Sequence, residues 1–290
     1  MNYKMMGRLI AQILLAEAAF MVPALIISLA GQDSQAILGF ALSILVILAV
    51  AGVLMFFARK AKKGFYAREG MVCVGLAWIV MSLLGCLPFW ISREIPSYLD
   101  GLFEIVSGFT TTGASILSNV EGLSNGMLYW RSFSHWVGGM GVLVFLLAVV
   151  PVSGRNDGFT MHLLRAESPG PNVAKLVPRI RSTAGILYIL YVVLTVVDFL
   201  LLIVGKMPVL EAVCTAFGTA GTGGFGVKND SMASYSPYIQ NVCTVFMLLF
   251  GVNFSCYYLL VMKQVKSVYK DEELRLYVGM VLGSVFLIVL

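Results

Sequence analysis

Two short segments rich in threonine and glycine hold the residue types in this sequence that are best suited to chemistry. They run from Thr110 to Ser115 and from Thr219 to Gly224. A dehydrated monovalent cation such as K⁺ needs oxygen ligands in place of its water shell, and rings of backbone carbonyls can supply them. Glycine permits the backbone angles that aim successive carbonyls inward, and threonine adds a hydroxyl group. The candidate filter residues are Thr110, Thr111, Thr112, Gly113, Ala114, Thr219, Ala220, Gly221, Thr222, Gly223 and Gly224.

Each segment ends a short apolar stretch, at about 97–117 and 208–226. The first half of each stretch is compatible with a helix, and about ten helical residues cover half a bilayer. We therefore predict two re-entrant loops, each a short helix followed by an extended return. Bare backbone at membrane depth is tolerated only inside protein or along a water-filled path, so the loops predict a pore. The negative end of each short helix would face the cation. A single Gly/Thr-rich turn could equally be an ordinary helix connection.

The composition is that of a membrane protein. Of 290 residues, 59% are hydrophobic and only 12% charged, against roughly 25% charged in soluble domains. A soluble protein with an unusually apolar core is the alternative. Long apolar stretches predict an all-α integral membrane fold, with a seventh span that begins near Leu274 and still continues at Leu290, which we take as a sign of C-terminal truncation. The other expected spans are 8–30, 36–58, 70–92, 128–151, 183–205 and 238–262.

The positive charges predict an orientation. We place the N-terminus in the cytoplasm and let both loops enter from outside. The outer side then carries four of the 20 Lys and Arg residues, and the cytoplasmic side carries all the others, as the positive-inside rule requires. The four outer residues are Arg93, Arg131, Lys206 and Lys228.

The chain contains an internal repeat of span, short helix, Gly/Thr return and span. The copies cover about 70–151 and 183–262. An alignment without gaps places Thr112-Gly113 on Thr222-Gly223. Both loops enter from the same side, so the repeats are parallel and related by an axis along the membrane normal, which suits a central pore.

Several ionisable residues lie in apolar stretches. Glu104 and Glu211, in the short helices, could act electrostatically at the pore mouth or brace a loop, or be capped or solvated helix residues. Glu17 and Asp198, inside spans, are expected to be interhelical hydrogen-bond partners, with a transport role as the alternative. For His135 we expect helix packing against the first loop, beside glycines that allow close approach.

No metal site, disulfide or catalytic motif is evident. The two histidines, His135 and His162, are far apart, and no two cysteines form a C-x-x-C pair, so the cysteines are interpreted as small buried apolar residues. No nucleotide-binding, nucleophile-elbow or metalloprotease motif occurs. We expect neither an enzyme, nor a bound cofactor, nor a nucleic-acid partner. The cysteines are Cys73, Cys86, Cys214, Cys243 and Cys256.

Five motifs together resemble the TrkH-type branch of the Trk/Ktr/HKT potassium transporter superfamily, along essentially the whole chain. They are Phe103-Glu104-Ile105-Val106-Ser107-Gly108-Phe109-Thr110-Thr111-Thr112-Gly113-Ala114, Trp130-Arg131-Ser132-Phe133-Ser134-His135-Trp136-Val137-Gly138-Gly139-Met140-Gly141, His162-Leu163-Leu164-Arg165-Ala166-Glu167, Thr219-Ala220-Gly221-Thr222-Gly223-Gly224-Phe225, and Thr244 to Phe254. The resemblance implies four span–pore–span repeats around a pseudo-fourfold pore, preceded by two extra helices. The implied units are 1–68 (extra helices), 69–152 (first repeat), 153–182 (cytoplasmic connector), 183–264 (second repeat) and 265–290 (start of the third).

The resemblance also implies a function. It indicates uptake of K⁺ across the cell membrane, with Gly113 and Gly223 as filter glycines. In this superfamily a serine at the first filter glycine is associated with Na⁺, so Gly113 favours K⁺. The family's plan further implies a homodimer and a soluble cytoplasmic regulatory subunit that binds nucleotides and NAD. The connector could be an interfacial helix, a docking surface for a partner or a plain loop.

Other functions remain open at this stage. The pathway could pass Na⁺ or discriminate poorly, and transport could be passive or coupled to H⁺ or Na⁺. A membrane-embedded enzyme would need converging ionisable residues, for which only Glu17, Asp198 and the two short-helix glutamates are candidates. A chain with two repeats could also be inactive alone, or form a pore with a second chain.

Overall fold

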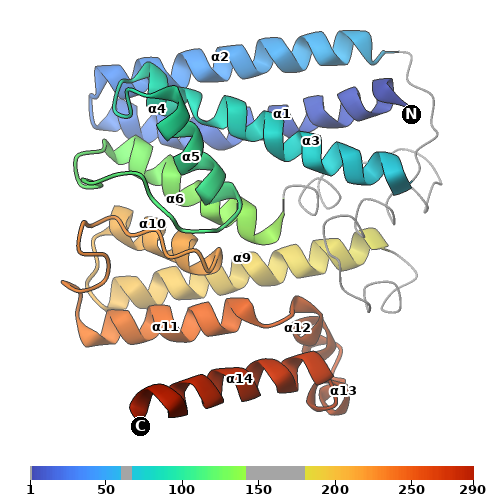
Figure 1. Cartoon of the computed structure of the whole chain (residues 1–290), viewed down its shortest axis with the longest axis vertical. Helices are drawn as coiled ribbons and strands as arrows, with labels where there is room; N and C mark the ends of the chain where they lie inside the picture. Colours follow the sequence, from blue (N-terminus) through green and yellow to red (C-terminus); the bar gives the residue numbers. More distant parts are fainter. Residues whose placement is uncertain (1, 60–66, 142–179) are drawn as a thin grey trace.

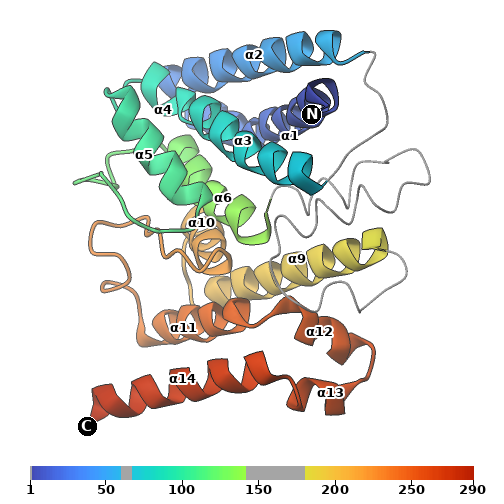
Figure 2. The same cartoon turned by 45° about the vertical axis from the view of Figure 1, so that its right-hand side comes forward.

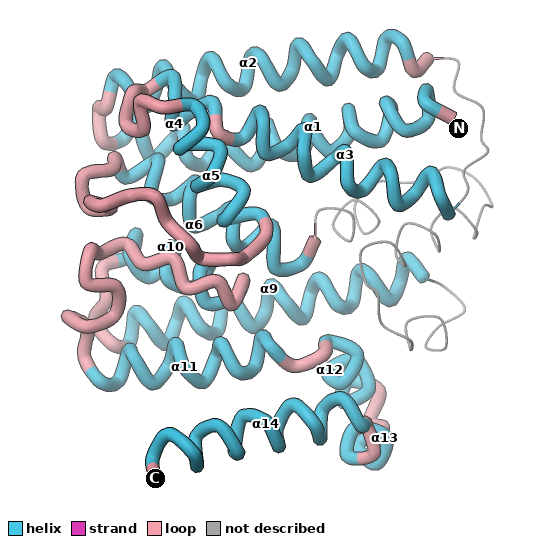
Figure 3. The backbone as a smooth tube through the Cα atoms, viewed as in Figure 1, coloured by secondary structure: helices cyan, strands magenta, loops and turns pink. Residues whose placement is uncertain are grey.

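The computed structural model describes residues 2–59, 67–141 and 180–290, and every regular element in these ranges is a helix (Figures 1 and 3). Four helical stretches are long and apolar enough to cross a membrane, and a bent pair adds a fifth if it is one span. The four are Tyr3–Ala30, Ser34–Phe57, Glu69–Ile91 and Gly185–Val204. These stretches confirm the prediction of an all-α membrane protein.

The N-terminal half contains six helices within the described ranges. They are α1 (Tyr3–Ala30), α2 (Ser34–Phe57), α3 (Ala67–Gly85), α4 (Leu87–Ile91), α5 (Tyr98–Phe109) and α6 (Asn125–Met140). Side chains at helix starts accept hydrogen bonds from free backbone N–H groups, as Asp33 does at α2 and Ser97 at α5. Ala11, Ala18 and Ala24 line the buried face of α1, and their small size lets neighbouring helices pack closely.

The C-terminal part of the chain, from residue 180 onward, repeats the order of a long helix, a short helix, an irregular return and a further helix. It contains α9 (Ile180–Val204), α10 (Val209–Ala220), α11 (Pro237–Gly251), α12 (Phe254–Val261), α13 (Val265–Tyr269) and α14 (Glu272–Val289). Helix α6 packs against both α5 and α10, and α9 packs against α10 and α11. Figures 1 and 2 show the long helices side by side, with the returns from α5 and α10 gathered at one face, here named the loop face (left in Figure 1).

The two short helices confirm the predicted helix-and-return segments. Helices α5 and α10 have 12 residues each, and an irregular return follows each of them. Twelve residues span about 18 Å, roughly half a bilayer, at the rise of an α-helix. Each short helix therefore has the length that the predicted re-entrant loops require.

The stretch expected as a span at 238–262 contains a sharp break. Helix α11 ends at Gly251, and α12 leaves it at an angle of 85°. Val252 adopts an extended conformation, and the side chain of Asn253 accepts a hydrogen bond from Ser255 N at 2.9 Å, which starts the new helix. Apolarity continues through the break, so hydropathy alone did not reveal it.

Some expectations lie outside the described residues. They concern the end of the first repeat at 142–152, the connector as far as residue 179, and the motif from His162 to Glu167. The last three residues of the predicted connector, 180–182, belong to α9.

Candidate functional site

The two returns have the same backbone turn. In the first, Thr111 and Gly113 have positive φ angles of 53° and 76°. In the second, Thr222 and Gly224 have φ angles of 53° and 77°. The turn is closed in both repeats by a backbone hydrogen bond of 2.9 Å, from Thr111 N to Gly108 O and from Thr222 N to Thr219 O. A non-glycine residue with positive φ is uncommon, so this matched pair identifies equivalent positions.

The matched turns correct the repeat alignment by one residue. Thr111 corresponds to Thr222 and Gly113 to Gly224, so the ungapped pairing of Gly113 with Gly223 is wrong. The bounds of α5 and α10 agree with the corrected register. Runs of glycine and threonine align almost equally well in two registers, and the backbone angles decide between them.

The two returns approach each other closely. A Cβ atom placed on Gly113 would collide with the carbonyl group of Gly223. One on Gly138, in α6, would collide with the backbone of Phe109 at the end of α5. Glycine is needed at both positions because backbone occupies the space of a side chain. The threonine hydroxyls bond locally: Thr110 Oγ1 lies 2.8 Å from Val106 O and 2.8 Å from Thr112 Oγ1.

A buried ion pair joins α5 and α6 next to the first return. Glu104 of α5 is 0% exposed and Arg131 of α6 is 2% exposed, and Arg131 Nε donates to Glu104 Oε1 at 2.6 Å. The same carboxylate accepts hydrogen bonds from Ser115 Oγ at 2.9 Å and Ile116 N at 3.0 Å. Glu104 therefore holds the end of its own return, which matches the loop-bracing alternative.

Arg131 also reaches the second return. Its Nη1 donates to Gly226 O at 2.9 Å, and its guanidinium carbon lies 3.6 Å from the centre of the Phe225 ring. One side chain thus ties both returns together. From the sequence alone, Arg131 is predicted only to be a positive charge on the outer side. The signal that could have identified its role is the cost of an unpaired charge in a membrane, which demands a partner such as Glu104.

His135 packs against the second return, not the first as expected. Its ring stacks on Phe225 with centroids 3.9 Å apart, and a Cβ on Gly223 would meet the same ring. One helical turn separates His135 from Arg131, so both side chains of α6 support Phe225. The sequence thus predicts correctly that His135 packs against a return, but it predicts the wrong return.

Glu211 has a separate role at the loop face. Its Oε2 accepts a hydrogen bond of 2.6 Å from the hydroxyl of Tyr235, which precedes α11. Burial and this hydrogen bond raise the pKa of Tyr235, so the phenol remains a donor. In the corrected register Glu211 does not correspond to Glu104, because Thr215 takes that place.

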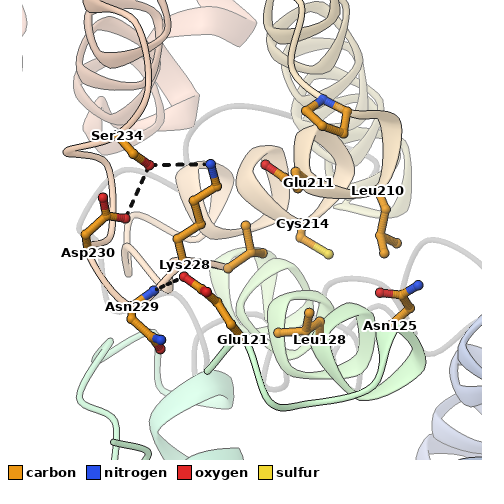
Figure 4. A pocket seen from close by; sticks show the side chains of 12 residues that line it. Glu121, Asn125, Leu128, Leu210, Glu211, Cys214, Lys228, Asn229, Asp230 and Ser234 are labelled. Atoms are coloured by element: carbon orange, nitrogen blue, oxygen red, sulfur yellow. Dashed lines mark hydrogen bonds between the residues drawn. The ribbon is translucent and has the colours of Figure 1, made fainter. Parts of the chain in front are cut away.

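A cavity of about 700 Å³ opens between α6 and α10 on the loop face (Figure 4). Three carboxylates and Lys228 line it, and each carboxylate has a hydrogen-bond donor: Glu121 accepts from Asn229 N, Glu211 from Tyr235, and Asp230 from Ser234. Within the described ranges, no group of three or more His, Cys, Asp or Glu could hold a metal ion. The cavity is therefore a recess on the loop face, lined by both charged and apolar side chains.

A family model described as TrkH, cation transport protein, matches residues 37–289. The Trk system potassium uptake protein TrkH of Salmonella typhimurium is 33% identical over 290 residues, covering 98% of this chain and 59% of that protein. The Trk system potassium uptake protein TrkG of Escherichia coli is 30% identical over 269 residues, covering 91% and 55%.

A solved structure also resembles this chain along most of its length. The crystal structure of the potassium transporter TrkH from Vibrio parahaemolyticus superposes with a TM-score of 0.80 at 27% sequence identity, covering 96% of this chain and 57% of that one. The chain thus spans less than two thirds of the length of these relatives.

Proposed function

Because this chain belongs to the TrkH family of cation transport proteins, we propose that it forms part of a pathway by which K⁺ crosses the cell membrane. The observation that carries the proposal is the matched turn at the end of each short helix, Thr111 to Gly113 and Thr222 to Gly224. Two identical turns in contact with each other are what a filter built from repeats requires.

In this proposal the ion ligands come from the two returns. They are drawn from Thr110, Thr111, Thr112, Gly113 and Ala114 in the first return and Thr219, Ala220, Gly221, Thr222, Gly223 and Gly224 in the second. Helices α5 and α10 place their negative ends at the returns and so favour a cation there. Two returns make half of a fourfold ring. The relatives are longer, and a third and fourth repeat would complete it.

The wider assembly follows from the family and from charge. We propose a cytoplasmic N-terminus, because sixteen of the 20 Lys and Arg residues then lie on the cytoplasmic side. A homodimer and a soluble nucleotide-binding regulatory subunit are the partners that family resemblance suggests. The resemblance also makes Na⁺ the competing ion, and Gly113 is the residue that favours K⁺.

The test is uptake of radioactive Rb⁺ in cells that lack their own K⁺ uptake systems. The 290-residue chain and the complete reading frame that contains it are compared, each with glycine or serine at position 113. We expect uptake by the longer form and a shift toward Na⁺ in Gly113→Ser. Correctly inserted protein that moves no Rb⁺ in either form would refute the proposal.

A further inference from the structure

Two carboxyl groups in the described structure are buried without a partner. Glu17 of α1 is 1% exposed and Asp198 of α9 is 0% exposed. None of their four carboxyl oxygens makes a hydrogen bond within the described residues. An unpartnered carboxylate inside a membrane protein is costly, so such groups are functional candidates.

Asp198 and Gly85 lie at the same sequence distance from matching turns in the two repeats. The span of each repeat ends in a residue with a φ of 65°, Arg93 in the first and Lys206 in the second. Counting eight residues back from these two turns reaches Gly85 and Asp198. Where the second repeat has a carboxyl group, the first repeat has no side chain.

Glu17 fills the place that Gly85 leaves free. A Cβ atom on Gly85 would lie 2.8 Å from Glu17 Oε1, and 3.2 and 3.3 Å from the side chains of Phe109 and Ile105 on α5. The carboxyl group of α1 therefore lies beside the C-terminal half of the first short helix.

Asp198 is buried on α9, which packs against the second short helix, and it lies near Cys243 of α11. It lies on the buried stripe of α9 between Thr195 and Leu202. Leu202 packs in one cluster with Ala212 and Ala216 of α10. Each repeat thus has one buried carboxyl group near its short helix, and the two groups come from different parts of the chain.

The surroundings contain no described cation to neutralise either group. The titratable groups that interact with them are thiols, Cys86 beside Glu17 and Cys243 beside Asp198. Arg131, a buried cation among the described residues, forms an ion pair with Glu104. A cation held by the returns is a positive charge that could act on both carboxyl groups.

We propose that Glu17 and Asp198 are equivalent positioning residues that set the affinity of the two returns for their cation. The inference rests on the proposed function. A bound cation favours the ionised carboxyl groups, and by reciprocity the ionised groups strengthen cation binding. Glu17 makes the N-terminal helix α1 a contributor to the filter of a repeat to which it does not belong.

The test is Rb⁺ uptake by Glu17→Gln, Asp198→Asn and the double variant in the complete reading frame. We expect KM to rise roughly five- to fifteenfold in each single variant, because removing a nearby negative charge weakens the attraction for a cation by about 1–1.6 kcal/mol. The maximal rate should change little, and Asp198→Glu should restore part of the affinity. Acidification should raise the KM of the wild type but not that of the double variant. Glu272→Gln, an exposed charge change on α14, is the matched control.

A second measurement separates this inference from the proposed function. Infrared difference spectra of purified wild-type protein with and without K⁺ should show a protonated-carboxyl band that weakens when K⁺ binds, and Asp198→Asn should reduce the change. Wild-type Rb⁺ uptake with unchanged KM in the variants would overturn the inference alone. Absence of wild-type uptake would refute the proposed function, and a carboxyl band that does not respond to K⁺ would overturn the inference in either case.

Discussion

Removing one member of the Glu104–Arg131 pair should damage both stability and selectivity. Glu104→Gln leaves Arg131 buried without its charge partner, and losing one side of a buried ion pair costs about 3–5 kcal/mol. The hydrogen bonds that Glu104 accepts from Ser115 and Ile116 weaken as well, because a neutral acceptor replaces a charged one.

The size of the effect can be measured in two ways. At about 2–4 °C per kcal/mol, we expect the thermal midpoint of the purified protein to fall by on the order of 10 °C. In uptake assays, the preference for Rb⁺ over Na⁺ should decrease, because Arg131 also holds the second return through Gly226 and Phe225.

A double-mutant cycle tests the reasoning most sharply. The double variant Glu104→Gln with Arg131→Met leaves no buried charge unpaired, so it should be more stable than the sum of the single losses by about 1–3 kcal/mol. Glu211→Gln is the matched control in the other short helix, where the amide oxygen can still accept the hydrogen bond from Tyr235. Strictly additive losses, or an unchanged ion preference in both single variants, would show that the pair does not brace the two returns.

Three further predictions follow from single contacts. Gly113→Ala should abolish Rb⁺ uptake, because a Cβ there collides with backbone and φ is positive, whereas Gly122→Ala, which meets mainly the Asn119 side chain, should retain uptake. His135→Phe should keep selective uptake and His135→Ala should lose it. The reason is that the His135 ring stacks on Phe225, whereas neither ring nitrogen has a hydrogen-bond partner among the described residues. Equal loss in both variants would contradict this. Burial raises the pKa of Glu94, so the folded state binds its proton more tightly, and stability should fall as pH rises from the usual glutamate pKa through the raised one. Glu94→Gln should remove that slope in thermal unfolding measured against pH, and an unchanged slope would contradict the assignment.

The sequence predicted the elements well because their signals are local. Apolar length identifies the spans, and a short apolar run before glycine and threonine identifies α5 and α10. The one-residue error in the repeat register arose because composition cannot distinguish Gly223 from Gly224, whereas backbone angle does. The 85° break after Gly251 was missed because apolar residues flank it on both sides.

The contacts between repeats could not be predicted from one sequence. Arg131 and Gly226 are far apart along the chain, and no local pattern links them. The same holds for His135 and Phe225, and for Glu17 and the space beside Gly85. A charged residue in an apolar segment signals that a partner exists without saying which one.

The reach of Arg131 into the second return also bears on how the protein is made. A membrane protein is synthesised from its N-terminus, so α5 and α6 are inserted before α10 exists. Glu104 can pair with Arg131 at that stage, so the guanidinium group is already positioned when Phe225 and Gly226 are synthesised. The second return can therefore fold against a first repeat whose ion pair has already formed. The order of the repeats in the sequence would then also be the order in which they assemble.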